Sequence, residues 1–119
     1  MNVETYREYC LKKKGAIEDY PFNDETLVFK VMNKIFLLTP LEKIPFSINL
    51  KCDPEKAVEL RERYEAVLPG YHMNKNNWIT VIVDNTIPER EIKELTDNSY
   101  DLVVQGLKKS DKAALEAMK

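Results

Sequence analysis

Three short strand patterns follow one another between residues 26 and 51, joined by short links. They run from Thr26 to Met32, from Lys34 to Thr39 and from Phe46 to Lys51. Asn33, in the first link, tolerates the positive φ of a tight hairpin. The third pattern alternates apolar and polar residues, which is typical of a strand with one face on a core and one in water. The spacing therefore predicts an antiparallel sheet with one open face.

The flanking patterns predict helices and two more strands. The expected helices run from Val3 to about Lys14, with Asn2 as cap and Gly15 as stop, and from Pro54 to about Tyr64, with Asp53 as cap. Expected strands are Ala66–Pro69 and Trp78–Val83. A capping box at Thr86–Glu89 predicts a late helix to about Lys108, whole or broken at Asp97-Asn98, before a short helix over Asp111–Met118.

The order of these patterns is α-β-β-β-α-β-β-α(-α). Strands that follow one another with separate helices predict an α+β fold: two layers, with a five-stranded, mainly antiparallel sheet and helices on one face. The chain has 119 residues, of which 44% are hydrophobic and 32% charged. This size and composition fit one folded domain over residues 1–119.

The sequence favours a cytoplasmic protein. Its apolar runs are far shorter than the roughly 18 residues of a membrane span, and its start lacks the pattern of a signal peptide. Cys10 and Cys52 follow no metal-binding or redox spacing, so we interpret them as buried thiols, with a disulfide as the alternative. No cofactor and no metal site is expected.

The predicted strands are more basic than the chain as a whole, whose net charge is −2. Segments 26–51 and 66–83 contain five lysines and one glutamate: Lys30, Lys34, Lys43, Lys51, Lys75 and Glu42. The sheet is therefore expected to be basic and the helices acidic. A further cluster, Lys12-Lys13-Lys14, suits the C-terminal end of a helix dipole, with a phosphate-contacting patch as the alternative.

Residues 69–84 hold the only histidine and the only tryptophan of the chain. The side chains of His72, Asn74, Lys75 and Trp78 can form a binding patch, or can hold a turn and cover a sheet face. Catalysis by His72 would need a carboxylate partner. The nearest in sequence, Asp84, is expected at the far end of a strand, so no enzymatic activity is expected.

The motif Tyr71-His72-Met73-Asn74-Lys75, followed by Trp78, resembles the MmcQ/YjbR family of small bacterial proteins over nearly the whole chain. Supporting pieces are Tyr9-Cys10-Leu11, Gly15-Ala16, Pro21-Phe22, Phe29-Lys30-Val31, Ser47 to Lys51 and Ser99-Tyr100. The family often has a second histidine before the tryptophan, where this chain has Asn77, so no role that needs two histidines is carried over. The resemblance implies a secretion-chaperone-like or CyaY-like fold and DNA binding through a double wing of hairpins.

Two hypotheses follow. The first is a DNA-binding protein that uses the open sheet face, with weak affinity for double-stranded DNA. Phosphate contacts would come from Lys30, Lys34, Lys51 and Lys75, and contacts to base edges from Asn74 and Asn76. The second is a protein-interaction or homodimerisation module whose contact surface is an exposed sheet face around Trp78. Neither hypothesis involves a membrane.

Overall fold

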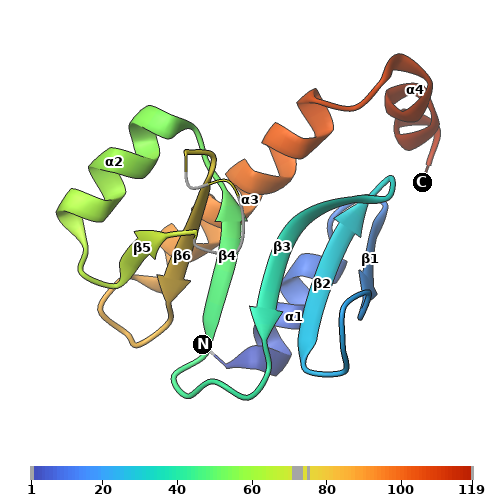
Figure 1. The fold of residues 1–119 in the computed structure, drawn as a ribbon. Helices are drawn as coiled ribbons and strands as arrows, with labels where there is room; N and C mark the ends of the chain where they lie inside the picture. The colour runs from blue at the N-terminus through green and yellow to red at the C-terminus, as the bar shows by residue number, and fades with distance from the viewer. Residues whose placement is uncertain (1, 71–73, 75, 119) are drawn as a thin grey trace.

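The computed structural model of the chain describes residues 2–70, 74 and 76–118. Four helices and six strands follow one another in the described part (Figure 1): α1 (Val3–Leu11), β1 (Ala16–Asp19), β2 (Thr26–Val31), β3 (Lys34–Pro40), β4 (Ser47–Lys51), α2 (Pro54–Arg63), β5 (Val67–Pro69), β6 (Trp78–Ile82), α3 (Glu89–Gln105) and α4 (Lys109–Ala117). None of these helices is long and apolar enough to cross a bilayer.

The strands form one antiparallel sheet in the order β1-β2-β3-β4-β6-β5, which confirms the α+β class. The expectation of five strands is wrong, because residues 16–19 form a sixth strand at the edge of the sheet. Strand β1 lies along β2, with Ala16 opposite Val31 and Asp19 opposite Val28. Its four residues hold too little apolar alternation to stand out in the sequence, so the pairing partner determines its structure.

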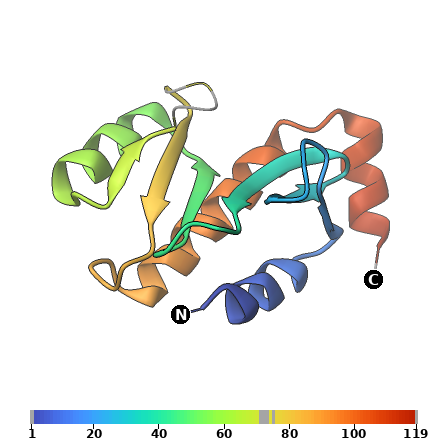
Figure 2. The same cartoon turned by 60° about the horizontal axis from the view of Figure 1, so that its bottom comes forward.

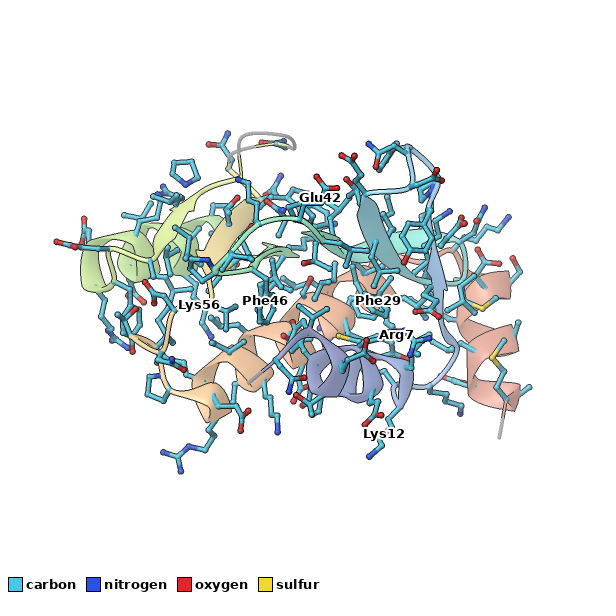
Figure 3. The ribbon with its side chains drawn as sticks, turned by 90° about the horizontal axis from the view of Figure 1, so that it is seen from below. Arg7, Lys12, Phe29, Glu42, Phe46 and Lys56 are labelled. Carbon is cyan, nitrogen blue, oxygen red and sulfur yellow. The ribbon has the colours of Figure 1, made fainter. Side chains whose placement is uncertain are left out.

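Helices α1 and α3 cover one face of the sheet (Figures 2 and 3). Phe29 and Phe46 point from the sheet toward these helices, whereas Glu42 lies on the opposite side (Figure 3). Both phenylalanines belong to a continuous core that extends to Leu115 of α4. Helix α2 packs instead against β5 and β6. The sheet therefore keeps one face without a helical cover among the described elements.

The sheet splits between its two central strands, β3 and β4. Only Leu37 with Leu50 and Leu38 with Asn49 pair in this ladder. At the next step, where Phe36 would face Lys51, the hydroxyl of Ser99 on α3 takes the place of the direct bond. It accepts the backbone N–H of Lys51 at 2.8 Å and donates to the carbonyl of Phe36 at 2.6 Å. Beyond this bridge the strands diverge, with α3 behind the gap (Figure 1).

The helix ends confirm two predicted caps and correct a third. Asn2 forms a full capping box with Thr5, and Asp53 accepts the N–H of Glu55 at 3.0 Å. Helix α3 has no such box, because the hydroxyl of Thr86 donates to Asp84 at 2.6 Å and the helix begins after Pro88 without a side-chain cap. It then runs unbroken through residues 97 and 98.

Both cysteines are buried and free, as the sequence indicates. Burial raises the pKa of the Cys10 thiol to about 12 and also raises the pKa of Cys52. Both thiols are therefore buried and protonated near neutral pH. Because the thiolate is the reactive form, we expect both to be unreactive in the folded protein. Because folding raises both pKa values, their contribution to stability is complete below the thiol pKa of the unfolded chain. It is lost as the pH rises through each raised pKa, which is about 12 for Cys10.

We therefore expect both thiols to be protected in the native protein. At about pH 8, a thiol-specific disulfide reagent should modify the folded chain at least about 100-fold more slowly than the chain in guanidinium chloride. The reason is that the reagent reaches a buried thiol only when the surrounding structure unfolds locally or globally. The measurement is the rate of absorbance change with and without denaturant. Equal rates in the two conditions would show that the thiols are accessible in the fold.

Candidate nucleic-acid interface

A hollow of about 470 Å³ lies where β3 and β4 diverge, and we call it the split hollow. The tip of the β2–β3 hairpin, the ends of β4 and β6 that meet there, and the C-terminal end of α3 contribute its lining. The lining residues are Asn33, Lys34, Ile35, Lys51, Trp78, Val103 and Gly106. Segments far apart in the sequence thus meet at one end of the sheet because the Ser99 bridge stops the β3–β4 ladder there.

Lys34 and Lys51 are the only charged residues among the described residues that line the split hollow. Neither ammonium group has an ion-pair partner within the described part of the chain. Two unneutralised cations beside a hollow whose described lining holds no carboxylate create a positive potential there. The arrangement suits an anion, and phosphate oxygens are anions that lysine commonly contacts.

Trp78 lines the split hollow but is only 8% exposed. It lies opposite Lys51 in the β4–β6 register, and its first side-chain carbon approaches Gly70 so closely that an added Cβ there would lie 2.7 Å away. The expectation that Trp78 is exposed on a sheet face is therefore wrong, because this side chain is buried. The interaction or homodimerisation module stays a prediction.

The turn before β6 places Asn74 and Asn76 on the surface. The side-chain oxygen of Asn74 accepts the backbone N–H of Asn76 at 3.0 Å, and its carbonyl accepts the N–H of Asn77 at 3.0 Å. Asn74 thus holds the turn, while the amide of Asn76 has no side-chain partner among the described residues. The other predicted residues of this segment, Tyr71, His72 and Lys75, lie outside the described residues.

Lys30 does not join the split hollow. Its ammonium group pairs with the carboxylate of Asp19 at 3.1 Å across the β1–β2 ladder, and its side chain is 15% exposed. The hydrogen bond from Lys30 holds the pKa of Asp19 below its usual range. The unpredicted strand β1 therefore supplies the partner that occupies this lysine.

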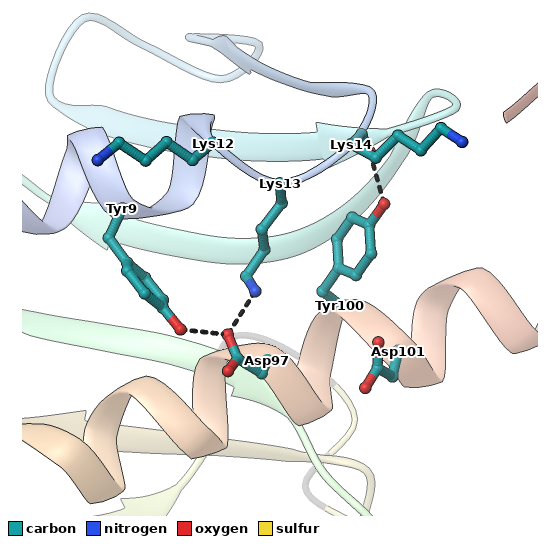
Figure 4. A pocket seen from close by; sticks show the side chains of 7 residues that line it. All are labelled: Tyr9, Lys12, Lys13, Lys14, Asp97, Tyr100 and Asp101. Atoms are coloured by element: carbon teal, nitrogen blue, oxygen red, sulfur yellow. Dashed lines mark hydrogen bonds and ion pairs between the residues drawn. The ribbon is translucent and has the colours of Figure 1, made fainter. Parts of the chain in front are cut away.

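The cluster Lys12-Lys13-Lys14 joins α1 to α3 (Figure 4). Asp97 accepts a hydrogen bond from the Tyr9 hydroxyl at 2.5 Å and also pairs with Lys13. The Lys13 ammonium lies 5.1 Å and 5.4 Å from the ring centroids of Tyr9 and Tyr100. These contacts give Lys13 a structural role, and the hollow that they line contains carboxylates as well as lysines.

Three features of the uncovered face and the split do not follow from the sequence. The alternation over residues 46–51 predicts Ser47 and Asn49 in water, but they are 4% and 5% exposed. They lie in a second hollow on the uncovered sheet face, whose rim includes Lys43. Ser99 was noted only as part of a family pattern, although it bridges the two halves of the sheet. No residue spacing in the sequence indicates that a serine hydroxyl on a helix will replace a backbone hydrogen bond between two strands.

The fold is that of an α+β protein with an antiparallel sheet, and two lysines, Lys34 and Lys51, line the split hollow at one end of it. The family model YjbR matches residues 11–102. The chain is 45% identical to uncharacterized protein YbdF of Escherichia coli O157:H7, over 91% of this chain and 88% of that one. It is 32% identical to uncharacterized protein YjbR of Escherichia coli K12, over 87% and 88%. The chain therefore belongs to the YjbR family.

A solved structure supports the same assignment. The crystal structure of protein DR2400 from Deinococcus radiodurans superposes with a TM-score of 0.91 at 38% identity, covering 97% of this chain and 88% of that one. A structure from Pseudomonas syringae superposes with a TM-score of 0.73 at 32% identity, over 86% and 98%. The fold is thus shared by family members of different bacteria.

Proposed function

We propose that this chain is a non-enzymatic DNA-binding protein that holds backbone phosphates at the split hollow. The observation that supports the proposal is the presence of Lys34 and Lys51 at one hollow, whose described lining residues include no carboxylate. Lys34 comes from the start of β3 and Lys51 from the end of β4, so only the folded sheet brings them together.

The positions of two segments at one end of the sheet support duplex binding. The β2–β3 connection and the start of β6 lie toward the same end of the sheet (Figure 1). Lys34 at the first of these segments and Trp78 at the second both line the split hollow. A hairpin tip and a strand end beside a basic hollow can follow a phosphate backbone, and hairpins that contact DNA are what the double-wing mode implied by the sequence resemblance uses.

Weak binding is expected from this arrangement. The net charge is −2, and only two described lysines line the split hollow. Lys30 lies elsewhere and is paired with Asp19. Phosphate contacts, rather than buried apolar area, would then contribute most of the affinity. Asn76 is exposed, so its amide is free to make the predicted contact to a base edge.

We expect binding to a random duplex to depend on salt with a logarithmic slope of about −1.8, because each neutralised phosphate contributes about −0.9. The affinity should then fall by about 12-fold between about 50 and about 200 mM salt. Fluorescence anisotropy of a labelled duplex titrated with the chain measures this slope. No binding at the lowest salt, or an affinity that salt leaves unchanged, would contradict the proposal.

A further inference from the structure

The uncovered face of the sheet carries the second hollow, which has a volume of about 530 Å³ and which we call the face hollow. It shares no lining residue with the split hollow. Its lining residues are Phe22, Asn23, Thr26, Leu38, Pro40, Lys43, Ser47, Asn49, Leu68 and Thr80. The volume lies within the range of small-molecule sites in proteins.

The floor of the face hollow is a row of residues across four strands. Leu38 pairs with Asn49, Asn49 with Thr80, and Thr80 with Leu68. Residues paired in this way point to the same face of a sheet. A polar centre is thus flanked by an apolar side chain on each side. Ser47 lies two residues before Asn49 on β4 and extends the polar centre along that strand.

The polar centre offers hydrogen-bond donors. The side-chain oxygen of Asn49 accepts the Thr80 hydroxyl at 2.6 Å, which leaves the Asn49 amide NH₂ to donate. Within the described residues, neither this NH₂ nor the Ser47 hydroxyl has a partner. Both residues are at least nine-tenths buried. Among the described residues, the only fully buried side-chain polar atom without a partner is Arg61 Nη1, so both of these unpaired donors are accessible from the hollow. A ligand with acceptor atoms can therefore pair with them.

Charge restricts the ligand further. Among the described residues, Lys43 is the only charged one that lines the face hollow, and it has no ion-pair partner in that part of the chain. The described lining contains no carboxylate, so an amine would lose its hydration there without a counter-charge. An anionic acceptor group would gain both the donors of the floor and the ammonium of the rim.

Apolar side chains surround the polar centre. Leu38, Leu68 and Pro40 border it, and Phe22 stands at the rim with 64% of its surface exposed. An exposed aromatic ring beside two leucines can cover a flat apolar body and remove apolar surface from water. The hollow is therefore complementary to a molecule with one anionic end and one apolar end.

We propose that the face hollow binds a small organic acid, with its carboxylate toward Lys43, Ser47 and Asn49 and its apolar ring or chain against Leu38, Leu68 and Phe22. This site is separate from the DNA interface and does not depend on it. The carboxylate would accept hydrogen bonds from the Ser47 hydroxyl and the Asn49 amide, which the described protein residues leave unused.

Naphthoate and its uncharged analogue naphthalenemethanol are suitable probes, because they share the ring and differ in the anion. We expect naphthoate to bind the full chain at least about 10-fold more tightly, since a charge-assisted hydrogen bond is lost in the alcohol. Amide NMR shifts should concentrate at Thr80 and Leu68 rather than at Val103 and Gly106 of the split hollow. Equal affinity for the two probes, or no binding of naphthoate, would overturn the proposal.

A charge variant locates the anion. Lys43→Gln should weaken naphthoate binding about 10-fold and leave naphthalenemethanol binding unchanged. Lys56→Gln, which removes an exposed lysine of α2 that does not line the hollow, is the matched control and should change neither. Ser47→Ala should weaken naphthoate about 5-fold through the lost donor. An unchanged affinity in both Lys43→Gln and Ser47→Ala would show that the acid binds elsewhere.

Discussion

Replacement of Ser99 by alanine is expected to lower the free energy of unfolding by about 2–4 kcal/mol. Alanine removes the hydroxyl that accepts the N–H of Lys51 and donates to the carbonyl of Phe36. Because Ser99 is fully buried, water cannot reach these backbone groups easily. Each buried group left without a partner costs about 1–3 kcal/mol, which is a large part of the stability of a domain of this size.

Urea unfolding followed by the fluorescence of Trp78 measures this effect. Ser110→Ala is the control, because Ser110 is exposed on α4 and makes no side-chain hydrogen bond among the described residues, so a change below about 0.5 kcal/mol is expected. If the two alanine variants had the same stability, the hydroxyl bridge would not hold the two halves of the sheet together.

The sequence predicts the central strands well because their signals are local. The alternation from Phe46 to Lys51 and the turn residue Asn33 specify a strand and a hairpin, and the structure gives Asn33 a φ of 69°. Strand β1 could not be predicted in the same way. Ile17 is 54% exposed, and its strand conformation depends on pairing with Lys30.

The candidate site could be predicted only in part. Basic residues on the strands indicate a positive sheet, and two of them, Lys34 and Lys51, meet at the split hollow. The sequence could not show that Lys30 is neutralised, because its partner lies on the strand that was missed. Nor could alternation show that Asn49 is buried, since the depth of a sheet face depends on loops and curvature that no strand pattern encodes.

The double variant Lys34→Gln, Lys51→Gln is expected to lower the affinity for duplex DNA by about 60-fold at about 0.1 M salt, because it removes two phosphate contacts of about 0.9 released counterion each. Glutamine removes the charge and keeps a polar side chain that is only one atom shorter. Both lysines lie at the border of the split hollow rather than in the core, so the fold should remain intact. The salt dependence should largely disappear with them.

Arg90→Glu is a charge-matched control, because it changes the net charge by the same amount as the double variant. Arg90 is exposed at the start of α3, and Gly106 of the split hollow follows the other end of this helix. The helix separates the two positions by about 24 Å, at about 1.5 Å per residue, which is beyond the Debye length at this salt. A general loss of positive charge and a local loss at the split hollow can thus be distinguished.

The most direct test of DNA binding at the split hollow is the anisotropy titration of one labelled duplex with these three proteins at about 0.1 M salt. We predict that the original chain and Arg90→Glu bind with affinities within about 3-fold, and that Lys34→Gln, Lys51→Gln binds about 60-fold more weakly. Equal weakening in both variants would mean that overall charge alone attracts the duplex. Unchanged binding by the double variant would place the DNA outside the split hollow.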